Sequence, residues 1–415
     1  MKTTLTLIFC LLSACTQAAD WPMFHGPDGE NRSPDTGLMK VWPEDGPELL
    51  WKTDILGEGQ SGFSTVTIQD GRIYTAGSKN GKSIVYCLTM TGEKIWEYEN
   101  GEVWEKNYAG TRSTPTVDGD RVYDFTSVGE LACLDAKTGT EIWRRNMLKD
   151  YEGQNIIWAL AESIRVDGDR IYCSPGGKKA AIVALDKMTG EEIWATPSLG
   201  HSTSYASPML FEQGGLKILA TTYAKGLVCV NADTGELLFT YEHLQRYDIN
   251  CCRPIYRDGH IFITNPGVAG VRNGASLLKI TVVGRKASAE LVWHNEHLDN
   301  LHDSVILLGD HLYGSSYDYL GGAFLCLDWK TGETVYEVRE TGKGSFTCAD
   351  GLLYYLCEKG RFFLIRPNPE SYDVLSTWRM PDEGEGPAWA HPVVLDGKMY
   401  LRRGKFLYCY NLTAR

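Results

Sequence analysis

The sequence predicts an all-β protein, an eight-bladed β-propeller made of four-stranded antiparallel blades. Three observations support this fold class. A short turn phrase is repeated along the 415 residues, a pair of apolar strands recurs eight times, and the two ends of the chain carry complementary parts of one repeat. Repeats of about 40–50 residues that are built from short strands are typical of propellers.

The repeated turn phrase contains Thr-Gly between two apolar stretches. Its copies are LDAKTGTEIW (134–143), LDKMTGEEIW (185–194), LDWKTGETVY (327–336), VNADTGELLF (230–239) and the shorter LTMTGEKIW (88–96). We expect the Asp of each copy to accept hydrogen bonds from the backbone N–H groups that follow it, and the Gly to adopt a positive φ. The aromatic residue that ends the phrase should then lie on an outer strand and pack between blades.

The second and third strands of each repeat form a recurring apolar pair, and Asp-Gly precedes most of the pairs. Asp-Gly is a strong signal for a hairpin turn. The chain has no segment of useful length with the period of a helix. The eight pairs begin at segments 72–77, 121–126, 170–175, 216–221, 260–265, 311–316, 352–357 and 398–403.

The chain ends predict how the ring closes. The last repeat stops at LYCYNLTAR without an outer strand, whereas residues 47–55 (PELLWKTDI) resemble that missing strand, with Trp51 at the aromatic position. Pairing of the two ends would leave no open edge in the ring. We therefore divide the chain into residues 1–19, a signal peptide, residues 20–46, an N-terminal lead-in, and residues 47–415, a single propeller.

The first residues predict export. Lys2 precedes an apolar stretch that is too short to span a bilayer, as in secretory signals. Residues 12–15 (LSAC) resemble a bacterial lipobox, which would attach a lipid to Cys15, whereas small residues before position 19 would allow ordinary cleavage after Ala18. Both alternatives stay open. The expected location is the bacterial periplasm, free or anchored by lipid to the outer membrane.

Composition restricts the partners and the role of the cysteines. The formal net charge of −12 makes nucleic acid a poor partner. Of the twelve cysteines, five occupy one repeat position within apolar strands, where a sister copy has Ala184, and we interpret them as small buried apolar residues. These five are Cys87, Cys133, Cys229, Cys326 and Cys409. We expect a monomer.

The turn phrase resembles the tryptophan-docking motif of the PQQ-like (quinoprotein) propeller family, Ala-x-Asp-x-x-Thr-Gly-x-x-x-Trp. Residues 184–194 match every position, and WPMFHGPDGENRS (21–33) is similar to the lead-in of exported bacterial members. The resemblance covers about residues 21–415 and implies the propeller fold. It leaves two functions open, because the family includes alcohol dehydrogenases that use PQQ and calcium as well as BamB-like outer-membrane assembly lipoproteins that bind no quinone.

Alignment of the repeats places three rings of residues on the innermost strands and the loops that enter them. The first two rings vary in chemistry and predict a binding face at the channel mouth, although solvated funnel residues would give the same pattern. The third ring is mostly small and hydroxylic. The rings are Phe63, Arg112, Ala161, Tyr205, Cys251, His302, Lys343 and Trp389; then Ser64, Ser113, Glu162, Ala206, Cys252, Asp303, Gly344 and Ala390; then Thr65, Thr114, Ser163, Ser207, Arg253, Ser304, Ser345 and His391.

The ring residues supply the candidate cofactor-binding set. These candidates are Arg112, Glu162, Tyr205, Cys251, Cys252, Arg253, Lys343, Trp389 and His391. The family's dehydrogenases carry a disulfide between adjacent cysteines against the quinone, so the resemblance implies that role for Cys251 and Cys252. Chance adjacency of two thiols remains the alternative.

The catalytic candidates belong to the dehydrogenase alternative. Asp303 would act as general base beside His302, Arg253 or Lys343 would pair with quinone oxygens, and Glu162 would offer a calcium ligand. No local motif of the sequence matches the calcium ligands or the base of those enzymes. Beyond this alternative we expect no metal site.

The leading hypothesis is a BamB-like scaffold of the bacterial cell envelope that performs no catalysis and needs no cofactor. Its partner would be an envelope protein or a small polar or carbohydrate ligand, and its only membrane attachment would be the lipid on Cys15. The first alternative is a PQQ- and calcium-dependent alcohol dehydrogenase. The second is a carbohydrate-binding propeller that uses the loop aromatics Trp104, Tyr108, Trp158 and Trp389 as stacking platforms.

Overall fold

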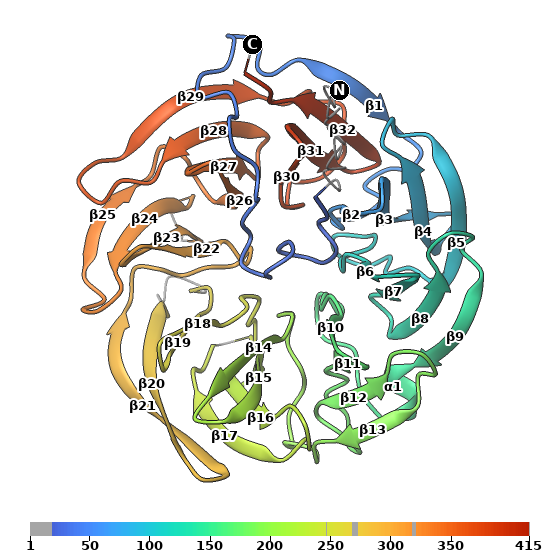
Figure 1. Ribbon diagram of the computed structural model, residues 1–415, viewed down its shortest axis with the longest axis vertical. Helices are drawn as coiled ribbons and strands as arrows, with labels where there is room; N and C mark the ends of the chain where they lie inside the picture. Colours follow the sequence, from blue (N-terminus) through green and yellow to red (C-terminus); the bar gives the residue numbers. More distant parts are fainter. Residues whose placement is uncertain (1–18, 246, 268–272, 318–320, 415) are drawn as a thin grey trace, which may run out of the picture.

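The computed structural model describes residues 19–245, 247–267, 273–317 and 321–414 as eight four-stranded sheets arranged around a central channel (Figure 1). The predicted eight-bladed propeller is therefore confirmed. The predicted signal segment, except residue 19, and Cys15 with its lipobox lie outside the described residues. Within the described part of the chain, no helix is long and apolar enough to cross a membrane.

The first four blades follow the chain from the channel outwards, and neighbouring strands within each blade are antiparallel. Blade 2 ends in a single turn of helix, α1 (Met147–Asp150). The strands are, for blade 1, β2 (Thr67–Gln69), β3 (Arg72–Lys79), β4 (Lys82–Thr89) and β5 (Lys94–Glu102); for blade 2, β6 (Thr116–Asp118), β7 (Arg121–Phe125), β8 (Glu130–Asp135) and β9 (Glu141–Asn146); for blade 3, β10 (Arg165–Asp167), β11 (Arg170–Cys173), β12 (Val183–Asp186) and β13 (Glu192–Ala195); and for blade 4, β14 (Met209–Gln213), β15 (Leu216–Tyr223), β16 (Gly226–Asn231) and β17 (Leu237–Glu242).

The other four blades repeat the same order, except that the outer strand of blade 8 comes from the beginning of the chain. They are, for blade 5, β18 (Ile255–Arg257), β19 (His260–Thr264), β20 (Ala275–Val283) and β21 (Lys286–Asn295); for blade 6, β22 (Val305–Leu308), β23 (His311–Ser316), β24 (Ala323–Asp328) and β25 (Thr334–Val338); for blade 7, β26 (Gly344–Ala349), β27 (Leu352–Cys357), β28 (Arg361–Arg366) and β29 (Asp373–Arg379); and for blade 8, β30 (Val393–Leu395), β31 (Lys398–Arg403), β32 (Phe406–Asn411) and β1 (Leu49–Thr53).

The ring closes as the sequence predicts. Strand β1 pairs antiparallel with β32, and Trp51 lies opposite Cys409 in the register. The Trp51 ring packs against the turn glycine Gly92 of blade 1, and its indole N–H donates to the carbonyl of Met90 at 2.9 Å. A strand from one end of the chain thus joins the last blade to the first and leaves the propeller without a gap.

The turn phrase explains how neighbouring blades fit together. Asp135 Oδ1 accepts from the backbone N–H groups of Lys137 at 3.0 Å and Thr138 at 2.8 Å, and Gly139 has a φ of 72°. A Cβ on Gly139 would lie 2.6 Å from the ring of Trp96 in the preceding blade, so the aromatic residue requires glycine there. Trp143, Trp194 and Trp293 pack in the same way against Gly190, Gly235 and Gly332.

The cores lie within and between blades, and the cysteines at the repeat position belong to them. Cys87, Cys133, Cys229, Cys326 and Cys409 are fully buried free thiols. Each one faces the aromatic position of the adjacent outer strand, as in the pairing of Cys133 with Trp143. The interpretation of these residues as small apolar core residues agrees with this burial.

The lead-in crosses the centre of the ring, as Figure 1 shows. It begins beside blade 1, where Trp21 forms a β-bridge with Ile68, and it reaches blade 7, where Arg32 forms a bridge with Cys348. We call residues 21–33 the plug. These contacts of the lead-in with blades 1 and 7 lie near the turns between the first and second strands of the blades. We call this side of the propeller the turn face. Asp20 accepts from the amide of Asp70 there, at 3.2 Å.

Candidate functional site

The third ring forms a chain of hydrogen bonds that ties the inner strands of blades 1–4 together. The backbone N–H of Thr65 donates to Thr114 Oγ1 at 3.1 Å, that of Thr114 to Ser163 Oγ at 3.0 Å, and that of Ser163 to Ser207 Oγ at 2.9 Å. All four residues are buried. We call them the hydroxyl ladder. Small hydroxyl residues recur at this ring position because each one satisfies a buried N–H of its neighbour.

Blade 5 breaks the ladder, because Arg253 stands where the preceding blades have Ser or Thr. The backbone N–H of Arg253 donates to Asp303 Oδ1 of blade 6 at 2.8 Å. Asp303 belongs to the second ring and has a positive φ of 53°. The wall between blades 5 and 6 is therefore joined by a carboxylate instead of a hydroxyl.

An aromatic group surrounds Trp389 at the channel mouth, on the side opposite the turn face. The ring centroid of Trp389 lies 4.8 Å from that of Phe63, 4.7 Å from that of Tyr108 and 5.6 Å from that of His302. Its indole N–H donates to Glu358 Oε2 at 3.1 Å. The protein's own side chains therefore cover much of the tryptophan surface on which a flat ligand would stack.

The two basic candidates of the mouth are also held within the protein. The Arg112 guanidinium donates to the carbonyls of Gly110, Asn107 and Tyr108 at 3.0, 3.1 and 2.8 Å, so it fixes the loop that carries Tyr108. Burial lowers the pKa of Arg112 to about 10, which leaves it charged at neutral pH. The Lys343 ammonium lies 3.3 Å from Glu358 Oε2.

The remaining aromatic candidates lie on the loops at the mouth. The Tyr205 hydroxyl accepts from the backbone N–H of Trp158 at 3.4 Å, and the two rings are 6.4 Å apart. Trp104 is buried, and its indole N–H donates to the carbonyl of Asn107 in the same loop at 3.1 Å. Tyr108 is 47% exposed and is the most accessible of the four residues considered as sugar-stacking platforms.

Cys251 and Cys252 are two free thiols in the structure. The Cys252 thiol donates to Asn300 Oδ1 at 2.8 Å, and Asn300 in turn binds the carbonyl of Ser304 at 3.0 Å. Burial raises the thiol pKa of both cysteines, which disfavours the reactive thiolate. In this arrangement Cys252 links blade 5 to the loop that enters blade 6.

Glu162 lies in the wall of blade 3 and is 1% exposed. Its carboxyl group receives hydrogen bonds from Ser174, from the backbone N–H at 3.0 Å and the hydroxyl at 3.3 Å. Burial raises the pKa of Glu162 to about 8, so the group is mostly protonated at neutral pH. Among the described residues, no group of three or more His, Cys, Asp or Glu side chains is placed to hold a metal ion.

The plug brings a second histidine environment to the channel centre. His25 Nε2 lies 3.1 Å from Asp303 Oδ2, so Asp303 contacts the plug and the amide of Arg253. Burial lowers the pKa of His25 more than Asp303 raises it. Burial opposes ionisation of Asp303, but His25 and Arg253 together hold the pKa of that carboxyl below its usual value. The pair at neutral pH is an imidazole beside an ionised carboxylate.

His391 completes this group from blade 8. Its Nε2 donates to the carbonyl of His302 at 2.6 Å, and its Nδ1 lies 3.4 Å from the amide nitrogen of Asn31 in the plug. Burial lowers the pKa of His391 to about 4 and that of His302 to about 3. Both imidazoles are therefore neutral at physiological pH and act as packing and hydrogen-bonding groups.

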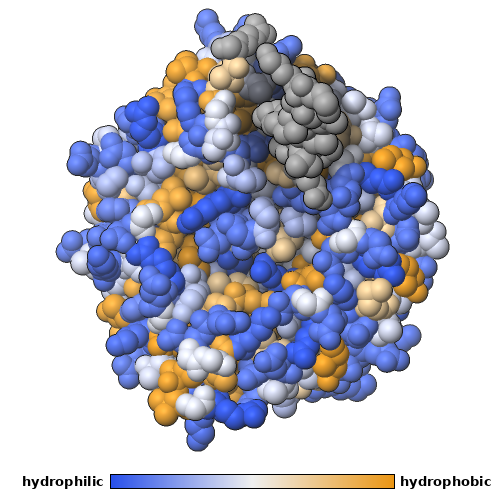
Figure 2. Space-filling view, viewed as in Figure 1, coloured by the Kyte–Doolittle hydropathy of each residue, from blue (hydrophilic) through white to orange (hydrophobic). Residues whose placement is uncertain are grey.

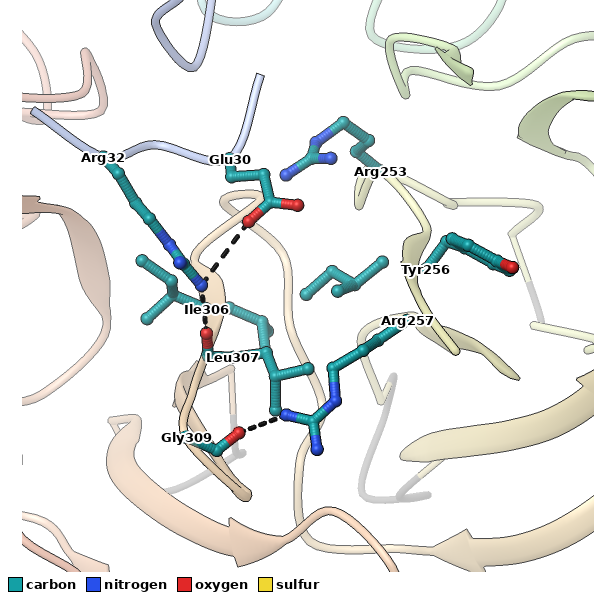
Figure 3. A pocket seen from close by; sticks show the side chains of 10 residues that line it. Glu30, Arg32, Arg253, Tyr256, Arg257, Ile306, Leu307 and Gly309 are labelled. Carbon is teal, nitrogen blue, oxygen red and sulfur yellow. Dashed lines mark hydrogen bonds and ion pairs between the residues drawn. The ribbon is translucent and has the colours of Figure 1, made fainter. Parts of the chain in front are cut away.

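A cleft of about 250 Å³ opens between β18 and β22 on the turn face (Figure 3). Guanidinium groups of Arg253, Arg257 and the plug residue Arg32 line it together with the Glu30 carboxylate. Its apolar surface comes from both inner strands, through Ile255, Val305, Ile306 and Leu307, and Tyr256 and Gly309 complete the lining.

The ring alignment placed all its residues at the channel mouth. The structure divides them between the mouth and the turn face, where the plug lies. Arg112, His302, Lys343 and Trp389 lie together at the mouth, whereas Arg253, Asp303 and His391 meet the plug. Sequence reasoning did not identify His25, Glu30, Asn31 and Arg32 as channel residues. The signal was present in the third ring, because only Arg253 and His391 depart there from small residues, and both adjoin the plug.

Comparison with protein families and relatives agrees with the resemblance to PQQ-like propellers. The family model described as "Outer membrane protein assembly factor BamB" matches residues 33–179. The outer membrane protein assembly factor BamB of Kangiella koreensis is 28% identical over 207 residues, which are 49% of this chain and 48% of that protein. The quinohemoprotein alcohol dehydrogenase of Comamonas testosteroni is 28% identical over 215 residues, 49% of this chain and 28% of that protein. The chain thus spans about half or less of the length of these two relatives.

Solved structures of both kinds share the fold. BamB from Moraxella catarrhalis superposes with a TM-score of 0.61 at 15% identity, over 88% of this chain and 100% of that chain. The quinohemoprotein alcohol dehydrogenase from Comamonas testosteroni superposes with a TM-score of 0.65, also at 15% identity, over 95% of this chain and 81% of that chain. The expected resemblance to PQQ-like eight-bladed propellers is confirmed, and it includes both functional classes.

Proposed function

From this confirmed resemblance, we propose that the chain is an exported propeller of the bacterial cell envelope that serves as a protein-interaction scaffold and performs no catalysis. The proposal rests on one observation at the channel mouth, namely that the candidate ligand-binding groups already bind other groups of the protein. The polar groups of Arg112, Lys343, Glu162 and Cys252 are each engaged with other groups of the protein. Groups that bind or transform a ligand need donors and acceptors directed at it.

A PQQ and calcium site does not fit the residues of the mouth. Calcium binds ionised carboxylates and other oxygen ligands, but Glu162 is buried with a raised pKa and is bonded to Ser174. The Trp389 ring, the natural floor for a tricyclic quinone, is covered by Phe63, Tyr108 and His302. We therefore derive no dehydrogenase chemistry for Asp303 and His302.

The rim of blades 4 and 5 supports a scaffold role. Strands β17 and β21 lie against each other, and they end the sheets with free edges. Leu237, Leu291 and Val292 on these strands are exposed by 42%, 51% and 45%, and Val283 at the end of β20 by 74%. We call these four residues the rim patch. Figure 2 shows apolar groups along the edge of the propeller where β17 and β21 lie. Exposed apolar groups at free sheet edges are typical of protein-binding surfaces.

The location and attachment belong to the same proposal. The sequence predicts a secretory signal, and the family model and several relatives carry the name of an outer-membrane assembly factor. We infer that the chain acts in the periplasm, either free or tethered by a lipid on Cys15. Its partner would be an envelope protein.

Two measurements test the proposal. Purified protein is incubated with PQQ and calcium, and quinone absorbance is followed through gel filtration, together with dye reduction in the presence of ethanol. We expect neither retained quinone nor dye reduction, and both together would overturn the scaffold assignment.

The second measurement tests the rim patch. Tagged protein is crosslinked in a bacterial envelope extract, and the captured proteins are compared with those captured by Leu237→Glu/Leu291→Glu. Ile193→Glu, at a 41% exposed position on β13, is the matched control. We expect a discrete partner that the control retains and the double variant loses. Identical capture by all three proteins would contradict the rim patch as the docking surface.

A further inference from the structure

The cleft between blades 5 and 6 contains an arginine with unused hydrogen-bond donors. Among the described residues, no ion pair or hydrogen bond engages the Arg253 guanidinium, and its Nε is buried without a partner. A buried donor without a partner costs roughly 1–3 kcal/mol. Such a group is retained at a cost, and Arg253 as a whole is half-buried, so part of the residue stays open to a ligand.

The other two arginines of the cleft are already engaged. Arg257 donates to the carbonyl of Gly309 and to Asp310 Oδ1, at 2.5 Å for the latter. Arg32 donates to the carbonyl of Leu307, and its guanidinium lies 3.4 Å from Glu30. Figure 3 shows Arg253 on the opposite side of Glu30, without a partner among the residues drawn. Glu30 is the one carboxylate among the residues that line the cleft, but Asp310 pairs with Arg257, and the charges of Asp303, Glu30 and Asp28 act on Arg253. What the cleft offers an anion is therefore the unpaired donors of Arg253 rather than a large excess of positive charge.

A second cavity strengthens the charge argument. This cavity of about 10 Å³ lies under the plug and is lined by Arg165 of blade 3 as well as by Arg253. Burial and the charge of Arg253 lower the pKa of Arg165. Two arginines of like charge therefore approach each other beneath the plug, where the charge of Asp28 attracts both, and an anion bound to Arg253 would add to that attraction.

The walls of the cleft define the rest of the ligand. Ile255 is buried, Val305 is half-buried and Leu307 is buried, so the strands present apolar surface beside the guanidinium. Tyr256 is held in place by stacking on Phe211, with ring centroids 4.1 Å apart. The volume of about 250 Å³ is below the roughly 300–1,000 Å³ of ordinary ligand pockets, which restricts the ligand to a small molecule.

We propose that the cleft between β18 and β22 binds a small carboxylate that carries a short apolar group, with the carboxylate on Arg253 and the apolar group against Ile255, Val305 and Leu307. The planar guanidinium matches a carboxylate through two parallel N–H donors. The site lies on the turn face, away from the mouth residues. It is independent of the scaffold function and of the rim patch.

Isothermal titration calorimetry on the full mature chain tests the site with hexanoate, phenylacetate and the uncharged phenylacetamide. We expect one site for the two carboxylates and no binding of the amide. Arg253→Gln should weaken carboxylate binding roughly 10- to 100-fold, the range expected for a hydrogen bond to a charged group. The carboxylate affinity of Arg253→Lys should lie between those of Arg253→Gln and the wild type, because lysine keeps the charge and loses the planar pair of donors.

Controls make each outcome decisive. Arg144→Gln removes a guanidinium from the outer strand β9 and should bind like the wild type, and thermal melts check that every variant is folded. A tripeptide Gly-Gly-Phe with a free or an amidated C-terminus distinguishes a peptide terminus from a free small carboxylate. Failure of both carboxylates to bind at millimolar concentration, equal binding by Arg253→Gln, or binding of the free-terminus peptide alone would overturn the proposal.

Discussion

The inner wall of the propeller is built in two ways. Along blades 1–4 the third-ring hydroxyls of Thr114, Ser163 and Ser207 each accept a hydrogen bond from the backbone of the preceding blade, and the inner strands are tied closely together. In blade 5 Arg253 stands at the hydroxyl position, its backbone N–H donates to Asp303 of blade 6, and a cleft lies between the inner strands of these two blades. The same ring position thus carries a structural hydroxyl in blades 2–4 and a guanidinium that lines a cleft in blade 5.

The plug spans the two regions, and its ends should contribute unequally to stability. Trp21, 1% exposed, packs at the blade 1 end, so Trp21→Ala should lower the free energy of unfolding by about 3–5 kcal/mol. Arg32→Ala, at the cleft end, should cost about 1 kcal/mol, because it loses mainly the bond to the Leu307 carbonyl. Urea unfolding measures both values. Equal losses would mean that the plug is not anchored mainly at blade 1.

The two buried carboxyl groups of the wall should respond to pH with opposite signs. The pKa of Glu162 is raised to about 8, above its ordinary value near 4.5, so the folded state holds a proton that the unfolded state releases. Stability is therefore lost as pH rises from about 4.5 to 8. Glu162→Gln should remove this loss and raise the free energy of unfolding by about 3 kcal/mol at pH 7, with little gain at pH 4.5.

Asp303 provides the contrast on the cleft side. Its pKa is held below the ordinary value, so its contribution to stability is present above that value, near 4, and is lost as pH falls through the lower folded pKa. Asp303→Asn should therefore destabilise the protein at pH 7 and have a smaller effect at acidic pH. Unfolding free energies at pH 4, 7 and 8 compare the two variants. If both variants changed the free energy of unfolding in the same way with pH, the assignment of opposite pKa shifts to Glu162 and Asp303 would be contradicted.

The fold could be predicted from local signals, because Asp, Thr and Gly of the turn phrase act on groups within a few residues. Ring closure was predictable from the aromatic position of Trp51. The plug was not, since the contacts of Trp21 with Ile68 and of Asn31 with Phe346 join distant residues without a periodic pattern. The adjacency of Cys251 and Cys252 suggested a disulfide from the sequence, whereas the structure has two free thiols, and the partner of Cys252, Asn300, became apparent only in three dimensions.

The hydroxyl ladder itself can be broken by an isosteric change. Thr114→Val removes the acceptor of the Thr65 amide and leaves that buried N–H unsatisfied. We expect a loss of about 1–3 kcal/mol in the free energy of unfolding. Thr377→Val, at an exposed position of β29, should be nearly neutral. Chemical denaturation of the two variants measures the difference, and equal stability would show that the ladder carries little energy.

The smallest change in stability is expected for a substitution that restores a hydroxyl at the third-ring position of blade 5. Arg253→Ser places a hydroxyl next to Ser207 and removes a guanidinium whose Nε is buried without a partner. The free energy of unfolding should change by less than about 1 kcal/mol, because removal of an unpaired buried donor stabilises the protein and loss of the guanidinium's attraction to Asp303 destabilises it. Thermal and urea unfolding check this value. A loss of several kcal/mol would reveal a structural role for Arg253 and remove the contrast between the two walls.

The most direct test observes the arginine side chains themselves. Protein labelled with ¹⁵N-arginine is titrated with phenylacetate, and the Nε–H resonance that is absent in Arg253→Ser identifies Arg253. We expect that resonance to shift on titration, while the one assigned to Arg112 at the mouth by Arg112→Lys stays in place. A shift of the Arg112 resonance alone, or of neither, would contradict the assignment of the ligand site to the open wall between blades 5 and 6.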